Sequence, residues 1–240
     1  MSSILDGFLE ALSLLFSFNP EIYQIMFMSL YVSGLATLLA AVIGVPLGAY
    51  IAMKKFRGRE FLRNVTYTMM GLPSVVAGLI IFLLLSRSGP LGMLGLLYTP
   101  FAIILAQFLL ALPVIAGISI SAVSSVPNEI RDAAFSLGAD NWQCTVAILK
   151  ESKMGLITGI ITGFSTCLSE VGAAMMVGGN IRFDTRVLST ATVLQAEQGA
   201  WGVALALGMI LLILVFVINY PLLRLQKKHL KLMKKAVRIE

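Results

Sequence analysis

The chain has few charged side chains. Only 12% of its 240 residues are Asp, Glu, Lys or Arg, whereas 58% are hydrophobic. A water-soluble globule of this size needs more polar groups to cover its surface. The composition therefore excludes a soluble domain and predicts a protein that lies in a bilayer.

Residues that bind metals or form disulfides are also scarce. The two cysteines, Cys144 and Cys167, fall in a polar loop and in an apolar segment, so neither a disulfide nor a thiolate metal cluster is expected. The single histidine, His229, stands in a basic tail without a second metal-binding side chain nearby. The sequence therefore predicts no metal site.

Familiar catalytic motifs are missing from the sequence. It has no Gly-x-x-x-x-Gly-Lys-Ser/Thr loop for nucleotide phosphates, no His-Glu-x-x-His zinc helix and no Gly-x-Ser-x-Gly elbow. An intramembrane protease would need paired reactive groups at matching depth, and only one acid, Glu170, lies deep in an apolar segment. A membrane-embedded enzyme is the weaker alternative, and any ATP hydrolysis is expected in another chain.

Long apolar segments define the architecture. Each membrane-spanning helix needs about 20 mainly apolar residues to cross roughly 30 Å of hydrocarbon. We predict an all-α membrane protein with five transmembrane helices within residues 21–223. The five segments that qualify are Tyr23–Met53, Val65–Leu85, Tyr98–Val123, Met154–Val177 and Trp201–Leu223.

The basic residues predict the orientation, because cytoplasmic loops of membrane proteins are enriched in Lys and Arg. If the loop after the first span is cytoplasmic, that side holds 15 of the 18 basic residues, and only Arg87, Arg182 and Arg186 lie on the other side. The N-terminus is then outside and the C-terminus in the cytoplasm of a multi-pass protein of the cell membrane.

Both terminal segments are predicted to meet the lipid surface. Leu5, Phe8, Leu12 and Leu15 line one face of residues 1–20, which indicates an external amphipathic helix at the interface. Leucines are interleaved with lysines in the basic tail, residues 224–240. This pattern favours a helix along anionic headgroups over binding of nucleic acid.

A polar stretch at residues 126–153 interrupts the apolar chain. Ile130, Ala133, Ala134 and Leu137 recur at helical spacing, and Gly138 suits the left-handed residue that ends a helix. Asp140 and Gln143 then have the spacing of a capping box that opens a second helix. Two helices around a glycine indicate a rigid docking surface, with an ordinary interfacial helix pair as the alternative.

The spacing of this stretch resembles the cytoplasmic "EAA" loop of the permease subunits of type I ABC importers. The match comprises an acidic residue, two alanines, a glycine and an isoleucine, although Lys150 and Glu151 replace the usual Leu-Pro ending and aspartate replaces the usual glutamate. In that family the loop, called the coupling helix, sits in a groove of a separate ATPase subunit. The resemblance implies that a partner subunit binds ATP and magnesium and contacts Asp132, Ala133, Ala134, Gly138 and Ile148.

Glu170 is the other informative polar residue. It shares a predicted helical face with Gly159, Gly163 and Thr166, small residues that allow close helix packing. A carboxylate in hydrocarbon costs several kcal/mol unless it is paired or hydrated. Glu170 is therefore either a structural tie or gate element, which we favour, or a direct contact for the cargo.

Prolines and glycines predict breaks in several spans. Gly71-Leu72-Pro73-Ser74 opens the second span, Pro113 falls in the third, and Gly44-Val45-Pro46 in the first. Unpaired backbone groups are tolerated only next to protein or a water-filled path. The freed amides, with the side chains of Ser74, Ser119, Thr166 and Glu170, are candidates for a translocation path or gate, and routine kinking is the alternative.

Residues Ser169–Ile181 and Thr185–Ala191 resemble oxyanion permeases, the molybdate, sulfate and tungstate group. Val171 follows the glutamate and Arg182 follows Ile181, where molybdate and sulfate relatives have an aromatic residue and a proline. The pattern is most similar to tungstate-type permeases. It implies ATP-driven uptake of an oxyanion, with tungstate as the cargo and molybdate or sulfate as alternatives, an external oxyanion-binding protein as partner, and a homodimer.

Overall fold

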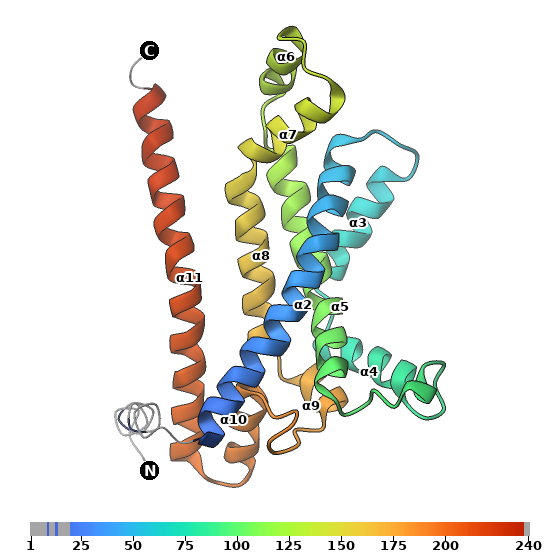
Figure 1. Ribbon diagram of the computed structural model, residues 1–240, viewed down its shortest axis with the longest axis vertical. Coiled ribbons are helices and arrows are strands. Elements are labelled where there is room, and N and C mark those ends of the chain that lie inside the picture. Colours follow the sequence, from blue (N-terminus) through green and yellow to red (C-terminus); the bar gives the residue numbers. More distant parts are fainter. Residues whose placement is uncertain (1–8, 10–12, 14–19, 238–240) are drawn as a thin grey trace.

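The structure, a computed structural model, describes residues 9, 13 and 20–237 (Figure 1). These residues form helices and no strand, which confirms the all-α prediction. The residues on which the predicted amphipathic helix of residues 1–20 depends, Leu5, Phe8, Leu12 and Leu15, lie outside the described part of the chain. The helices are α2 (Pro20–Met53), α3 (Arg59–Met69), α4 (Ser74–Leu85), the 3-10 helix η1 (Gly92–Leu94), α5 (Pro100–Ser124), α6 (Asn128–Ser136), α7 (Asn141–Glu151), α8 (Lys153–Leu168), α9 (Gly172–Gly178), α10 (Leu188–Glu197) and α11 (Trp201–Val237).

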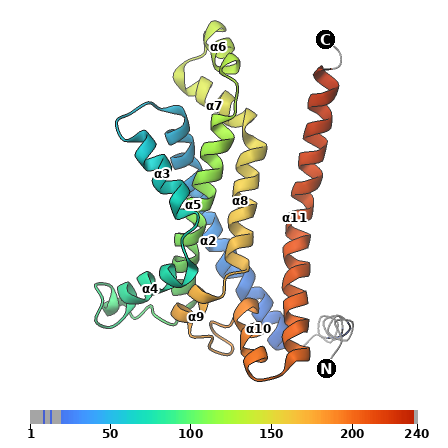
Figure 2. The same cartoon turned by 180° about the vertical axis from the view of Figure 1, so that it is seen from behind.

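Three helices are individually long and apolar enough to cross a membrane: α2, α5 and the Trp201–Pro221 part of α11. They run along the long axis of the molecule (Figures 1 and 2). The other two predicted spans are broken helix pairs, with a bend of 101° between α3 and α4 and of 59° between α8 and α9. The chain therefore has five spans only if each bent pair counts as one.

The predicted spans Val65–Leu85 and Met154–Val177 are therefore bent helix pairs, and the break predicted at Gly71–Ser74 lies between α3 and α4. Pro73 explains the first break, because proline lacks an amide hydrogen and keeps the residue before it out of the helical region. The predicted interruptions at Pro46 and Pro113 are absent, since α2 and α5 continue through these prolines.

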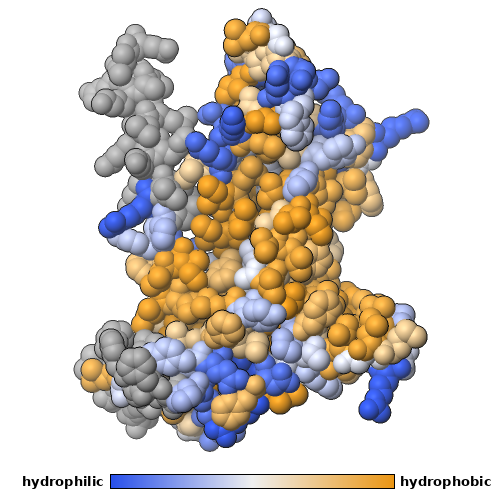
Figure 3. Space-filling model, in the orientation of Figure 1, coloured by the Kyte–Doolittle hydropathy of each residue, from blue (hydrophilic) through white to orange (hydrophobic). Residues whose placement is uncertain are grey.

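Hydropathy divides the surface into three zones. Figure 3 shows a broad hydrophobic band between two ends where hydrophilic residues gather. Large apolar side chains, including Phe27, Val42, Leu212 and Phe216, are exposed. Such a band suits lipid tails or a second copy of the chain rather than water.

Close packing of α2, α5 and α8 builds the core. A methyl group added to Gly48 of α2 would lie 2.5 Å from the carbonyl oxygen of Ala116 in α5, so only glycine permits this approach. Gly159 and Gly163 of α8 contact Ile118 and Ile115 of α5 in the same way. This confirms the predicted small-residue face of α8 and identifies α5 as its neighbour.

The basic tail does not form a separate helix. Residues 224–237 continue α11 in line with its apolar part (Figure 2). The sequence predicts instead a helix that lies along the lipid headgroups, and α11 makes no turn that would bring residues 224–237 into that position. The distal end of α11 and the α6–α7 pair lie at one end of the molecule, whereas the start of α2, α9 and α10 lie at the other (Figure 1). The described chain thus begins and ends on opposite sides, as an odd number of spans requires.

Candidate functional site

The α6–α7 pair is a compact projection at one end of the molecule, which we call the coupling knob (residues 126–153; Figure 1). Gly138, between the two helices, has a φ of 81°, the left-handed conformation predicted from the sequence. Amides that follow α6 donate hydrogen bonds to carbonyls of its last turn. Leu137 N–H donates to Ala133 O at 3.1 Å, and Ala139 N–H donates to Ala134 O at 3.0 Å. The turn at Gly138 therefore pairs carbonyls in the last turn of α6.

A reciprocal cap fixes the start of α7. The amide of Gln143 donates to Asp140 Oδ1 at 2.7 Å, and the amide of Asp140 donates to Gln143 Oε1 at 3.0 Å. This confirms the predicted capping box. The end of α6 and the start of α7 are therefore both capped by groups of the knob itself.

One side of the knob packs on the helix bundle. Cys144 and Ile148 of α7 are buried against Ala49 of α2 and Val123 of α5, and Ala134 of α6 packs at the edge of this cluster. Of the five predicted coupling residues, Ile148 thus anchors the knob and Gly138 shapes it. A buried Ile148 cannot itself touch another subunit in this arrangement.

The other side of the knob exposes apolar side chains. Leu137 is 89% exposed and Trp142 72% exposed, and Phe135 is also exposed. Asp132 and Ala133 lie on the surface of α6 near them. Apolar groups of this size at the hydrophilic end of a membrane protein indicate a protein interface.

The breaks in the two bent spans lie side by side. Gly78 of α4 faces Ala173 of α9 so closely that a methyl group on Gly78 would lie 2.8 Å from Ala173 Cα. A methyl group on Gly172 would lie 3.1 Å from Ser74 Oγ and 3.6 Å from Glu170 Oε1. The structure therefore brings together Ser74 and Glu170, which are 96 residues apart in the printed sequence.

Glu170 sits in the α8–α9 break and caps the shorter helix. Its Oε1 accepts a hydrogen bond of 3.0 Å from the amide of Ala173, and its backbone carbonyl accepts one from the hydroxyl of Ser189 at the start of α10. The carboxylate thus compensates a free amide of α9, and the backbone ties α9 to α10. This geometry supports the structural-tie hypothesis.

The two other predicted path residues do not join this junction. Thr166, near the end of α8, donates its hydroxyl to Thr162 O of the same helix at 3.0 Å. Ser119 is fully buried between α5 and α2, where its Cβ would lie 2.7 Å from a methyl group on Gly48. Its hydroxyl has no hydrogen-bond partner among the described residues, yet its place is in a helix contact and not beside an open path.

Gln107 is a polar residue that sequence reasoning missed. It is buried in the middle of α5, and its Nε2 donates to the carbonyl of Cys167, in the last turn of α8, at 2.9 Å. The same carbonyl accepts the amide of Glu170 at 3.2 Å. Gln107 therefore supports the α8 end of the break, and its isolation in an apolar run was the signal that could have revealed it.

Substitution of Gln107 by leucine is expected to destabilise this junction. The variant keeps the side-chain size but loses the bond to Cys167 O, at a cost of about 1 kcal/mol, which lowers the midpoint of thermal unfolding by about 2–4 °C. Thermal unfolding of the detergent-solubilised chain measures this. Gln198→Leu, at an exposed glutamine, is the control and should leave the midpoint unchanged. Equal midpoints for both variants would contradict the assigned role of Gln107.

The loop before α10 is clamped to the start of α2. Arg182 binds both carboxylate oxygens of Glu21, at 2.9 and 2.6 Å, and Arg186 approaches the same carboxylate at 3.5 Å. The hydrogen bonds to Glu21 raise the pKa of the Arg182 guanidinium above its ordinary value. Two of the three basic residues predicted to face outside thus form ion pairs with Glu21. These pairs connect the loop to α2 and partly neutralise the charge that could otherwise attract an anion.

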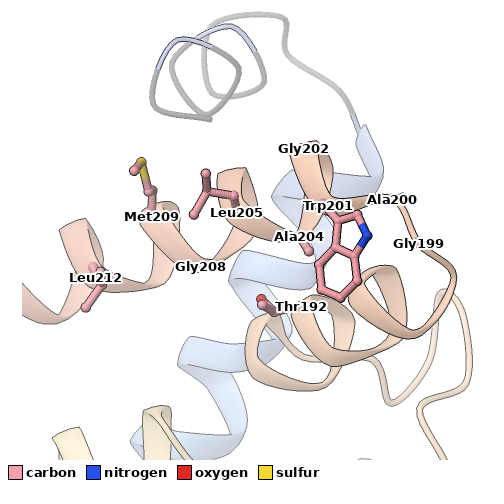
Figure 4. A pocket seen from close by; sticks show the side chains of 10 residues that line it. All are labelled: Thr192, Gly199, Ala200, Trp201, Gly202, Ala204, Leu205, Gly208, Met209 and Leu212. Carbon is pink, nitrogen blue, oxygen red and sulfur yellow. The ribbon is translucent and has the colours of Figure 1, made fainter. Parts of the chain in front are cut away.

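A separate cavity is mainly apolar, and none of these charged groups lines it. It measures about 1120 Å³ and lies along α11 beside the end of α10 (Figure 4). Trp201, Leu205, Met209 and Leu212 line it, and the hydroxyl of Thr192 there donates to Leu188 O at 2.8 Å. Such a lining suits an apolar side chain or acyl chain rather than an oxyanion.

The exposed apolar band, the broken spans and the coupling knob are together typical of the membrane subunit of a transport system. Residues 44–228 match the family described as "Binding-protein-dependent transport system inner membrane component", and the chain belongs to this family. The protein is therefore a permease subunit and not itself an enzyme.

Three comparisons place the chain within the family. It is 41% identical to the tungstate uptake system permease protein TupB of Peptoclostridium acidaminophilum, over 95% of this chain and 100% of that one. It is 44% identical to a probable anion ABC transporter permease protein of Haloferax volcanii, over 80% and 84% of the two chains. The fold resembles that of the inward-facing MetNI methionine ABC transporter, with a TM-score of 0.71, 18% identity, and coverage of 88% and 98%.

Proposed function

We propose that this chain is the permease subunit of an ATP-driven importer of tungstate. The observation that carries the proposal is the 41% identity to a tungstate uptake permease over that protein's entire length. The Ser169–Ile181 pattern, read from the sequence alone, supports the same substrate. Molybdate and sulfate are the alternative cargoes, because these oxyanions share the charge and tetrahedral shape of tungstate.

The junction between α4 and α9 is the part of the chain best suited to line or gate the path. Ser74 and Gly172 meet there at the ends of two helices, next to the Glu170 cap. Neutral hydroxyl and amide donors suit a passing anion, because a fixed positive charge would trap it. Two copies of the chain, packed through their exposed apolar surfaces, would enclose the path between them and rock as rigid bodies.

The proposal includes two protein partners. An ATPase subunit, which binds ATP and magnesium, is proposed to dock on the coupling knob through Ala133, Phe135, Leu137 and Trp142. An external oxyanion-binding protein is proposed to deliver the cargo at the opposite end, where α9 and α10 lie. The match to a binding-protein-dependent transport family disfavours a membrane-embedded enzyme and an ion channel.

Loss of the chain is expected to abolish high-affinity tungstate accumulation. Elemental analysis by mass spectrometry of a deletion strain, grown at low external tungstate and molybdate, measures both metals. Tungsten content should fall to background while molybdenum content is spared. Equal loss of both would broaden the substrate to group-six oxyanions, and retention of both with loss of sulfate uptake would refute the proposal.

The coupling knob and the end of α11 are proposed to be cytoplasmic, with the α10 end external. Single cysteines at Ser136, in the knob, and at Gln198, after α10, should therefore react with membrane-impermeant reagents from opposite sides. Both positions are exposed, whereas the native Cys144 and Cys167 are buried and give little background. Labelling of both positions from outside would overturn this topology.

A further inference from the structure

A basic cavity lies at the base of the coupling knob. It measures about 240 Å³ and forms where the end of α2, the start of α3, the end of α5 and the start of α6 meet. Its lining includes three cationic side chains, Lys55, Arg59 and Arg131, and no acidic one. This surface has no part in the proposed path or in the exposed docking face of the knob.

Arg59 is fixed in position by backbone groups. Its Nε donates to Ile51 O at 2.8 Å and its Nη2 to Ala52 O at 3.0 Å, which caps the last turn of α2. Carbonyl oxygens satisfy these donors but do not neutralise the charge. Glu60, the neighbouring acid, lies 4.0 Å from Arg63 instead. Within the described part of the chain, no acidic side chain therefore pairs with the Arg59 guanidinium beside the cavity.

Arg131 contributes a second uncompensated charge from the other wall. It is half-buried in α6, and within the described part of the chain it makes neither an ion pair nor a hydrogen bond. A guanidinium withdrawn from water without a counter-charge is unfavourable, and like charges around one cavity add repulsion. Lys55, exposed at the rim, adds a third positive charge.

The start of α6 adds to this potential. Pro127 occupies the position before the helix and offers no side-chain cap, and both Pro127 and Asn128 line the cavity. The first amides of a helix carry partial positive charge and favour anions. Helix end and cations thus converge on one cavity from different segments of the chain.

We propose that this cavity binds a tetrahedral oxyanion group of the phosphate type, held by Arg59, Arg131 and Lys55. Arginine and lysine are the side chains that bind such groups, arginine through paired N–H donors. The group has two possible sources with the same chemistry, the headgroup of an anionic lipid and a free inorganic anion. Because the cations come from the α2–α3 connection and from α6, a bound group fastens the coupling knob to the helix bundle.

The test measures thermal unfolding of the purified full-length chain in neutral detergent. One arm adds sodium phosphate against sodium chloride at equal ionic strength, and the other adds phosphatidylglycerol against phosphatidylcholine to the micelles. The double variant Lys55→Gln/Arg131→Gln removes two of the three cations. Arg59 is left intact because its substitution would also uncap α2. Arg57→Gln is the matched control, an exposed basic residue of the same loop outside the cavity lining.

We expect phosphate or phosphatidylglycerol to raise the unfolding midpoint of the unmodified chain and of Arg57→Gln by about 2–4 °C more than that of the double variant. Phosphate also stabilises proteins by exclusion from their surface, so the difference between variants decides the result. A response to the lipid alone identifies a headgroup as the ligand, and a response to phosphate alone identifies a free anion. Equal responses of all three proteins would overturn the proposal, as would no response, which would leave an acidic side chain of a partner protein as the counter-charge.

Discussion

Replacement of Ala133 by aspartate should abolish oxyanion uptake and substrate-stimulated ATP hydrolysis while the chain still folds and enters the membrane. Ala133 is exposed on α6, so a carboxylate there meets water in the isolated chain and costs little stability. When the knob docks on the ATPase, the same carboxylate would be buried in the interface beside Leu137, one helical turn away, without a partner. Burial of an unpaired charge costs about 3 kcal/mol or more, which weakens the contact more than a hundredfold.

Three measurements separate lost coupling from misfolding. Uptake of labelled tungstate and ATP hydrolysis by the reconstituted complex should both fall to background, and the thermal midpoint of the isolated variant should stay within about 1 °C, as expected for a surface substitution. Ala133→Ser is the control, because it adds a polar group of similar size without charge and should keep most of the uptake. Normal uptake by the aspartate variant would show that this face of α6 stays in water.

The coupling knob could be predicted from the sequence because its signals are local. Gly138 ends one helix and the Asp140–Gln143 pair opens the next, and each effect acts within a few residues. Helical spacing also placed Ala134 on an apolar face. It could not show that Ile148 lies against Ala49 and Val123, because spacing defines the face of a helix and not its neighbour.

The junction of the broken spans was harder to predict because distant segments build it. Pro73 marks one break in the sequence, but the bend of 101° follows from how α4 packs across Ala173 through Gly78. The partner of Gln107 lies 60 residues away. Glu170 was recognised as a costly buried acid, yet its cap on Ala173 and its tie to Ser189 depend on a break that the apolar pattern conceals.

The sequence also could not distinguish hydroxyl groups at the junction from hydroxyl groups buried in helix contacts. Ser74 and Ser119 look alike in the sequence, as small polar residues beside helix-breaking positions. The structure places Ser74 at the α4–α9 junction and encloses Ser119 between α2 and α5. Proximity to proline or glycine therefore indicates where backbone bonding changes, whereas access to a path depends on the neighbouring helix.

Replacement of Glu170 by glutamine should preserve most uptake, whereas replacement by alanine should abolish it and lower thermal stability. Glutamine keeps an Oε1 that can accept the amide of Ala173, now at 3.0 Å from the carboxylate, and it removes a charge that repels an anionic cargo. Alanine leaves this amide without a partner at the start of α9, at a cost of about 1–3 kcal/mol. Since α9 has only seven residues, loss of its cap disturbs the whole junction.

The two variants together distinguish a structural role of Glu170 from a role of its charge in transport. Uptake, membrane insertion and the thermal midpoint in detergent are measured for each, and the alanine variant should lose uptake together with about 2–12 °C in midpoint, the shift that its lost cap implies. A mechanism in which Glu170 gains and loses a proton, or gates by its charge, requires the ionised form, so glutamine would then fail as completely as alanine. A glutamine variant that is inserted and stable but transports nothing would reject the structural tie and place the carboxylate in the transport step itself.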